Sequence, residues 1–240
     1  MRYLYLLVFF VLFIFACERN SENSHRLDLA PPIPLNLLES DKIPPSPDKD
    51  PSAWLLAHID VETTGLLPGY HEMIDIGLVY TDLEGTIIDS LFLRIQPEFP
   101  SRTSPIARQI NAYDSLKWEE LNALDPESAV EELLSFHRKV GKDKSSLMVS
   151  FNSHFDLSFL DQLFRSANHS WREMFHYFVL DIPSMAWSMG YRDLTLDNFL
   201  AERNIEDEPH IAHLHTGISG ALVNVRIYQE LIRKQKEVNP

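Results

Sequence analysis

The sequence predicts one α/β domain with a mixed β-sheet, spanning residues 53–240 of the 240-residue chain. Compact apolar runs bounded by turn residues, which are typical of strands, fill the first part of this region. Apolar residues at helical spacing then alternate with further strand-like runs. Three strands followed by alternating strands and helices are typical of an α/β domain with a mixed sheet. Hydrophobic residues make up 45% of the chain, which is enough for a substantial core.

The predicted strands are Leu55–Val61, Met73–Thr81, Ile87–Ile95, Leu147–Phe151 and Phe178–Leu180. Residues 82–85 (Asp-Leu-Glu-Gly) separate the second strand from the third, so we expect a hairpin there. The predicted helices are Ser128–Val140, Leu157–Ala167, Leu194–Arg203 and Ile218–Lys234. We expect the four tryptophans to lie in the core, and they are Trp54, Trp118, Trp171 and Trp187.

Residues 1–17 have the pattern of a secretory signal peptide. Arg2 precedes an apolar run from Tyr3 to Ala16, about 14 residues and shorter than a comfortable membrane span of ~20. Residues 14–17 (Ile-Phe-Ala-Cys) resemble a bacterial lipobox, and Cys17 is the only cysteine of the chain. We therefore expect a lipid on Cys17 that anchors the protein in the bacterial cell envelope, on the periplasmic or surface side. A plain cleaved signal, a short uncleaved anchor or a mispredicted start are the alternatives.

Residues 18–52 are predicted to form a Pro-rich linker between this signal and the domain. The segment is rich in Ser, Asn and Asp and holds seven of the fifteen prolines. Proline fixes φ and has no backbone donor, which excludes a regular helix or a central strand. We interpret the segment as a tether that holds the domain off a membrane surface.

Residues 58–65 (His-Ile-Asp-Val-Glu-Thr-Thr-Gly) place two carboxylates at the end of the first predicted strand. Asp60 and Glu62 are two residues apart, so their side chains point to the same face. Adjacent carboxylates repel one another unless they are protonated or bridged by cations. Oxygen ligands suit a hard divalent ion such as Mg²⁺ or Mn²⁺. We therefore predict that Asp60 and Glu62 are metal ligands.

A third acid, Asp156, lies at the start of a predicted helix that follows a strand. Taken alone it is typical of an aspartate that caps a helix N-terminus, where negative charge is favourable. Its position after Asp60 and Glu62 instead favours a third metal ligand.

With these acids in this order, the chain resembles the DEDD family of 3′–5′ exonucleases, of the DnaQ-like, ribonuclease H-like fold, from about Trp54 to Leu231. The match includes residues 75–77 (Asp-Ile-Gly), where the family usually has Glu-Ile-Gly. The resemblance implies a five-stranded mixed sheet flanked by helices. It implies two divalent ions, Mg²⁺ or Mn²⁺, with Asp60 and Glu62 as ligands of both and Asp156 holding the second through water.

The resemblance also implies which residues line the pocket for the 3′-terminal nucleotide. They are Thr63, Leu66, Asn152 and Phe155. An aromatic wall there would stack on a base. Asp181 lies in a segment that resembles the strand and helix between the second and third motifs, so we expect it to be structural.

The third motif departs from the family. In its histidine branch, called DEDDh, a histidine is followed five residues later by an aspartate, and aligning the last helix places His215 and Gly220 at these positions. Glycine cannot bind a metal, whereas His215 is expected to be the general base. A shifted register would make His210 the base and His215 a ligand. Asp207 or Glu208 is a further alternative as a substitute ligand.

The sequence thus favours a metal-dependent 3′–5′ exonuclease acting on DNA or RNA outside the cytoplasm. The net charge of −14 repels polyanions, which disfavours a processive binder of long duplex and is compatible with single-stranded nucleic acid or short oligonucleotides. Gly220 motivates one alternative, a catalytically impaired lipoprotein that binds nucleotides or a protein partner. A structural envelope protein is another alternative, because fold alone does not determine function.

Overall fold

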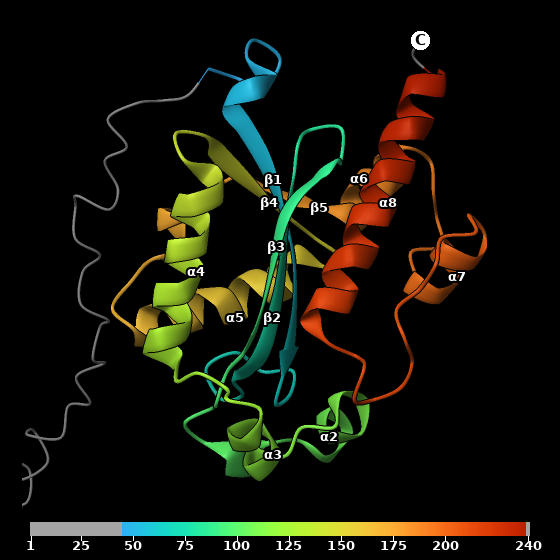
Figure 1. The fold of residues 1–240 in the computed structure, drawn as a ribbon. Helices are drawn as coiled ribbons and strands as arrows, with labels where there is room; N and C mark the ends of the chain where they lie inside the picture. Colours follow the sequence, from blue (N-terminus) through green and yellow to red (C-terminus); the bar gives the residue numbers. More distant parts are fainter. Residues whose placement is uncertain (1–44, 239–240) are drawn as a thin grey trace, which may run out of the picture. The chain divides into compact units, whose positions relative to one another are not determined.

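The structure is a computed structural model that describes residues 45–238 (Figure 1). These residues belong to one compact unit, Glu39–Pro240. The predicted signal peptide, Cys17 and most of the linker lie outside the described residues, so the anchor stays a prediction. Within residues 45–238, no helix is both long enough and apolar enough to cross a membrane.

A five-stranded mixed sheet forms the centre of the domain, with strand order β3-β2-β1-β4-β5. β1 pairs antiparallel with β2 and parallel with β4, and β5 continues the parallel part. β2 and β3 form the expected hairpin. All five predicted strands are confirmed with small shifts at their ends; they are β1 (Trp54–Thr63), β2 (Met73–Thr81), β3 (Ile87–Arg94), β4 (Ser145–Ser150) and β5 (Val179–Asp181).

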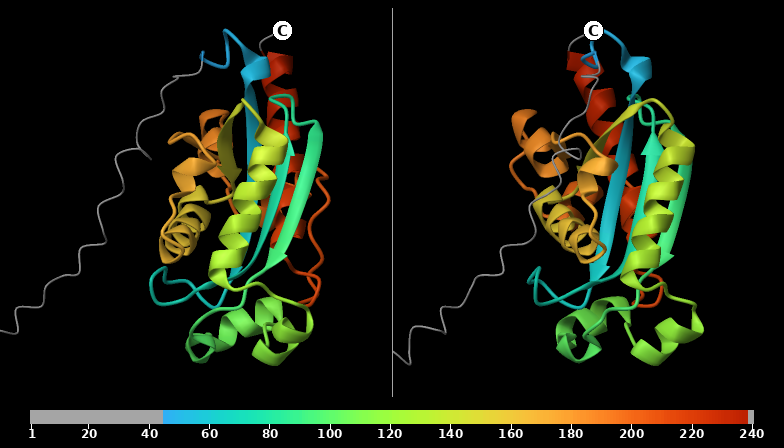
Figure 2. Two further views of the ribbon diagram at one scale, coloured as in Figure 1. Left: turned by 60° about the vertical axis from the view of Figure 1, so that its left-hand side comes forward. Right: turned by 90° about the vertical axis from the view of Figure 1, so that its left-hand side faces the viewer.

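Helices cover both faces of the sheet (Figure 2). The larger core, on the side of α4 and α5, includes Leu133 and Phe164. The opposite core joins α6, α7 and α8 and includes Phe199 and Ile227. The helices are α2 (Pro105–Asn111), α3 (Ser115–Glu120), α4 (Pro126–Gly141), α5 (Ser153–Ser166), α6 (Ile182–Ser188), α7 (Leu196–Ala201) and α8 (Gly217–Val238). Four of these were predicted, although α7 is shorter than expected.

The prediction for the tryptophans is wrong at one position. Trp54 and Trp118 are buried, and Trp171 packs against the larger core. Trp187 is 52% exposed. Ile182, Pro183 and Ala186 form the buried side of the short helix α6, which leaves Trp187 outside, where the Arg192 guanidinium lies 4.2 Å from its ring.

β1 carries alternating side chains to two different environments. Ile59 and Val61 enter the core beneath α4 and α5, whereas Leu56 enters the core beneath α8. Because side chains alternate along a strand, Asp60 and Glu62 share the α8 face with Leu56. The acids therefore lie where β1, the central strand, meets the beginning of α8.

At the start of α8, the helix backbone packs directly against the backbone of the sheet. A Cβ built on Gly77 of β2 would lie 2.2 Å from the carbonyl oxygen of Gly217, and one built on Gly217 would lie 2.5 Å from the carbonyl oxygen of Asp60. Side-chain hydrogen bonds fix the approach: the Gly217 amide donates to Asp75 Oδ1 at 2.8 Å, and Asn224 Nδ2 donates to the Ile59 carbonyl at 2.8 Å.

We predict that Gly77→Ala destabilises the fold by ~1–3 kcal/mol, because the added methyl group forces α8 away from β2. At an unhindered strand position, removing glycine would instead stabilise the fold. Urea unfolding monitored by circular dichroism measures the change, with Ser90→Ala on the exposed side of β3 as the control. An unfolding midpoint at or above that of the unchanged protein would contradict the close packing.

Candidate active site

Asp60 lies at the centre of the acidic group and faces the first turn of α8. A Cβ built on Gly220 would lie 2.3 Å from Asp60 Oδ2. Glycine at this position therefore allows α8 to approach the Asp60 carboxylate. Burial raises the pKa of Asp60 well above its ordinary value, and repulsion from Asp156, Glu62 and Glu208 raises it further.

Glu62 is buried and has a different partner at each carboxylate oxygen. Asn111 Nδ2 of α2 donates to Oε2 at 3.3 Å, and His215 Nε2 lies 3.1 Å from Oε1. Burial, then repulsion from Asp75, raises the pKa of Glu62 to about 8, against the hydrogen bond from Asn111, which lowers it. Asn111 also donates to the Thr63 carbonyl at 3.0 Å, so α2 holds the end of β1 in place.

Asp156 is in the first turn of α5, and its side chain points back to the sheet rather than capping the helix. The Val61 amide donates to Oδ1 at 3.2 Å, and Ser150 Oγ of β4 donates to Oδ2 at 2.5 Å. Asn152 occupies the cap position, with φ of 61°. Burial raises the pKa of Asp156 to about 7, although the bonds from Ser150 and Val61 lower it.

Asp75 of β2 is a fourth acid near the site, and it is buried. It pairs with Glu62 of the neighbouring strand in the register of β1 and β2. Burial raises its pKa to about 7, against the hydrogen bond from the Gly217 amide. The sequence matched this position to a family motif without giving it a role. Asn111, Ser150 and Asp75 were all missed as site residues. A single polar residue in the apolar strands β2 and β4 carries no spacing signal, and Asn111 ends a short helix that was not predicted.

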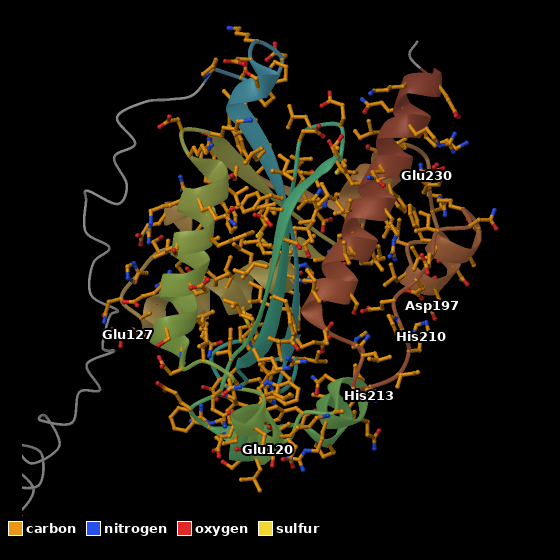
Figure 3. The ribbon with its side chains drawn as sticks, in the orientation of Figure 1. Glu120, Glu127, Asp197, His210, His213 and Glu230 are labelled. Atoms are coloured by element: carbon orange, nitrogen blue, oxygen red, sulfur yellow. The ribbon has the colours of Figure 1, made fainter. Side chains whose placement is uncertain are left out.

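His215 precedes α8 and lies between two carboxylates. Its Nε2 is 3.1 Å from Glu62 Oε1, and its Nδ1 is 3.3 Å from Glu208 Oε2. The structure therefore brings His215 to the acids, as the first register predicts. His210 lies on the exposed part of the same loop, where its Nε2 is 2.9 Å from Asp207. Figure 3 shows His210 and His213 on the loop that leads into α8, and both are exposed.

The four predicted substrate-binding residues lie on two segments. Thr63 ends β1 and is buried, and its hydroxyl donates to the Gly65 carbonyl at 2.7 Å. Leu66 follows on the loop and is 77% exposed. Asn152 is exposed at the start of α5, and the half-buried Phe155 ring lies 4.9 Å from that of Phe159. Leu66 is thus the apolar side chain most accessible to a ligand.

Asp181 has the structural role that the sequence predicts. Its Oδ1 accepts from the Ser153 amide at 3.0 Å, and its Oδ2 accepts from the Ser184 amide at 3.0 Å. Asp181 therefore caps α6 and ties the beginning of α5 to the end of β5.

The fold is similar to that of several exonucleases of known structure. The nuclease domain of 3′hExo, a DEDDh family member, bound to rAMP, is 15% identical with a TM-score of 0.62, over 75% of this chain and 92% of that chain. E. coli exonuclease I in complex with a dT13 oligonucleotide is 13% identical with a TM-score of 0.61, over 77% of this chain and 42% of that chain. The fold is that of these exonucleases. The ribonuclease H-like sheet predicted from the sequence is thereby confirmed.

Sequence comparison gives one curated relative of the exonuclease-fold domain. A DNA polymerase III PolC-type from Mycoplasmopsis pulmonis (strain UAB CTIP) is 27% identical over 180 residues, which are 75% of this chain. The matched region spans 12% of the length of that polymerase. No family model matches the sequence.

The acids of the exonuclease-fold domain suit a hard divalent ion in their chemistry. Asp60, Glu62 and Asp156 offer carboxylate oxygens whose raised pKa values show that full ionisation is opposed without a compensating positive charge. Within residues 45–238, no three acidic or histidine side chains already form a ready-made metal cluster. His215 contacts Glu62, and both oxygens of Asp156 accept hydrogen bonds from the sheet.

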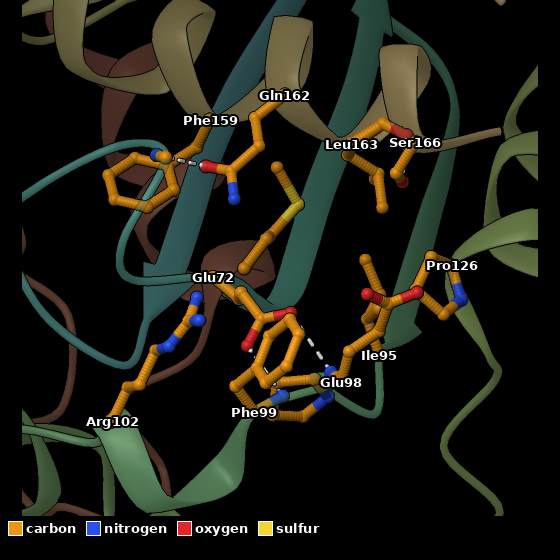
Figure 4. Close-up of a pocket in the computed structure, with 13 residues that line it drawn as sticks. Glu72, Ile95, Glu98, Phe99, Arg102, Pro126, Phe159, Gln162, Leu163 and Ser166 are labelled. Carbon is orange, nitrogen blue, oxygen red and sulfur yellow. Dashed lines mark hydrogen bonds between the residues drawn. The ribbon is translucent and has the colours of Figure 1, made fainter. Parts of the chain in front are cut away.

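A pocket of about 120 Å³ opens on the α5 side of the sheet (Figure 4), whereas Asp60 and Glu62 are on the α8 side. Gln162 Oε1 accepts from the Gly69 amide at 2.8 Å across it. Glu72 accepts from the backbone amides of Glu98 and Phe99, both at 2.9 Å. The pocket is therefore built where the loop after β1, the loop after β3 and α5 meet.

The raised pKa values predict how stability depends on pH. The folded protein holds protons on Glu62 and Asp156 up to about pH 8 and pH 7, whereas their ordinary values are 4.5 and 3.8. The folded state therefore binds more protons over this interval, so stability present at acidic pH is lost as pH rises toward 8. With a chelator present, we expect a lower Tm at pH 8 than at pH 5.5. Mg²⁺ should raise Tm more at pH 8.

Asp60→Asn tests the same prediction by removing one of the repelling charges. We expect this variant to show a smaller fall of Tm between pH 5.5 and pH 8. Glu120→Gln is the control, because Glu120 is exposed on α3 (Figure 3). Equal slopes for Asp60→Asn and Glu120→Gln would contradict the electrostatic origin of the effect.

Proposed function

We propose that the chain is a metal-dependent 3′–5′ exonuclease that hydrolyses single-stranded DNA or RNA, including short oligonucleotides. The observation that carries the proposal is the group of carboxylates Asp60, Glu62 and Asp156, which repel one another at one end of the sheet beside His215. Three acids with raised pKa values at one site are typical of a functional rather than a structural role. The likeness of the fold to exonucleases of known structure supports this reaction class.

Each residue has a distinct task in the proposed reaction. Asp60, Glu62 and Asp156 would hold Mg²⁺ or Mn²⁺, and two such ions, when bound, supply the positive charge that stabilises the attacking and departing oxygens. His215 accepts a proton from the attacking water through Nε2. The water oxygen forms a bond to phosphorus and the bond from phosphorus to the 3′ oxygen breaks. The 3′ oxygen takes a proton from solvent to become the 3′-hydroxyl of the shortened strand, and a nucleoside 5′-monophosphate is released.

The surface around the pocket of Figure 4 supports a single-stranded substrate. Tyr70 and Phe99 are exposed aromatic residues. The Arg102 guanidinium lies 5.2 Å from the centre of the Tyr70 ring and 3.8 Å from that of the Phe99 ring. Tyr70 shares its loop with Leu66, the accessible residue of the predicted nucleotide pocket. Aromatic rings stack on bases of any sequence, and arginine adds attraction to phosphate and to the rings.

The location outside the cytoplasm is part of the proposal. It rests on the signal-like residues 1–17 and on Cys17 as the lipid attachment site. A lipid anchor would restrict the enzyme to nucleic acid that reaches the cell envelope.

We predict that the purified chain shortens a 5′-labelled single-stranded oligonucleotide from its 3′ end when Mg²⁺ or Mn²⁺ is added. Asp60→Ala should lower kcat by about 10³-fold or more, because several kcal/mol of transition-state stabilisation depend on the metal ligands. Asp197→Ala is the control, since Asp197 is an exposed acid of α7 (Figure 3). Gel analysis of DNA and RNA substrates measures both variants.

Absence of cleavage with either ion, on DNA and on RNA, would refute the exonuclease proposal. It would favour the second candidate, an impaired relative that binds nucleotides. That candidate is motivated by Gly220, which faces Asp60 where the family has an aspartate. Calorimetric titration of a nucleoside 5′-monophosphate with Mg²⁺ would then detect binding without turnover.

We predict that Arg102→Ala raises KM for a single-stranded oligonucleotide about 3- to 10-fold, because the loss of one guanidinium contact to a substrate phosphate costs roughly 1 kcal/mol. The p-nitrophenyl ester of thymidine 5′-monophosphate should be hydrolysed unchanged, since it is too small to reach Tyr70 and Phe99. Arg172→Ala is a matched control, because this guanidinium lies 5.5 Å from the Trp171 ring on another surface. An equal effect of both variants would contradict the assignment.

A further inference from the structure

The imidazole of His215 is held between two carboxylates that come from different parts of the fold. Glu62 of β1 lies 3.1 Å from Nε2, and Glu208 of the loop after α7 lies 3.3 Å from Nδ1. The side chain of His215 is 23% exposed and that of Glu208 is 10% exposed. The ring therefore has an acid on each side, and only Glu62 is one of the three predicted metal ligands.

Glu208 is fixed in this place by other contacts. Ser219 Oγ, in the first turn of α8, donates to Glu208 Oε2 at 2.7 Å, and the same hydroxyl accepts from the Thr216 amide at 3.1 Å. The neighbouring Asp207 turns the other way and pairs with His210. One side chain of this acidic pair thus points inward and the other outward.

The position of Glu208 differs from that expected of a metal ligand that replaces the aspartate missing at Gly220. Glu62 and Glu208 contact opposite nitrogens of one ring, so His215 separates the two carboxylates. Glu208 is close enough to Asp60 and Glu62 to raise their pKa values, but its side-chain contacts are with His215 and Ser219. This geometry suits an acid that acts on the histidine rather than on the metal.

We propose that Glu208 is a positioning residue that fixes His215 with Nε2 directed toward the metal-binding carboxylates. The proposal rests on the exonuclease function above, in which His215 is the general base. A carboxylate beside Nδ1 stabilises the tautomer that carries its proton there. Glu62 beside Nε2 favours the opposite tautomer, and a cation held by Glu62 would remove that competition and leave the lone pair of Nε2 to accept a proton. Glu208 also stabilises the positive charge that His215 gains when it takes that proton.

The tautomer of His215 is the direct test. In the full chain labelled with ¹⁵N-histidine, with Mg²⁺ present and the imidazole neutral, we expect His215 to carry its proton on Nδ1. The signal is assigned by its loss in His215→Ala. Glu208→Ala should move the proton toward Nε2, whereas Glu208→Gln keeps an acceptor oxygen and should retain the Nδ1 tautomer. An unchanged His215 tautomer in Glu208→Ala would overturn the proposal.

Kinetics give the second test. General bases contribute about 10²- to 10⁴-fold, so we expect Glu208→Ala to lower kcat about 10- to 100-fold with little change in KM. Adding Glu208→Ala to His215→Ala should have little further effect on kcat, because both changes remove the same general base. Glu206→Ala is the matched control, since Glu206 is on the same loop with its side chain 85% exposed. Fully additive losses in the double variant would also overturn the proposal.

Failure of this proposal can be separated from failure of the proposed function. If the unchanged protein cleaves nothing, the exonuclease assignment fails, and the tautomer measurement still decides whether Glu208 orients His215. If the unchanged protein is active and Glu208→Ala matches it in kcat and tautomer, only the role of Glu208 is refuted.

Discussion

The close approach of α8 to β1 and β2 is the constraint on which the site depends. Gly77 and Gly217 let the helix backbone touch the sheet backbone, and the hydrogen bonds to Asp75 and Ile59 fix its position. This contact brings the start of α8, and the loop that precedes it, over the acidic end of β1. A side chain at Gly77 or Gly217 would push the start of α8 outward and move His215 away from Glu62. Packing between two glycines therefore sets the distance between the base and the carboxylates.

The same contact creates an electrostatic conflict. Asp60, Glu62, Asp75 and Asp156 are gathered in low-polarity surroundings, and burial is the largest cause of each raised pKa. Folding alone gains nothing from this arrangement, since it weakens the ionised forms of all four acids. Backbone amides of Val61 and Gly217 and the side chains of Ser150 and Asn111 offset part of that cost. The remaining repulsion is what a bound cation would relieve.

The sheet was predictable because its strands are mostly apolar runs bounded by turns, and β1, β2 and β4 are buried along nearly their whole length. The positions of Asp60 and Glu62 followed from alternation along a strand. The short helices α2 and α3 were not predicted, since six or seven residues are too few to show a helical period. Asp207 and Glu208 are adjacent and chemically alike, so only the contacts with Ser219 and His215 reveal that Glu208 turns inward. The exposure of Trp187 likewise depends on which side of a seven-residue helix meets the core.

The site is assembled from two separately anchored pieces. Asp60, Glu62 and Asp156 stand on the sheet and the beginning of α5, whereas His215 and Glu208 belong to the single segment between α7 and α8. Such a connecting segment opens more readily than the core strands and exchanges its amide hydrogens sooner. Local opening of this segment would remove the base together with the acid beside it, while the carboxylates keep their places. In the proposed exonuclease, the opening equilibrium of this one loop would set the fraction of molecules that have a complete site.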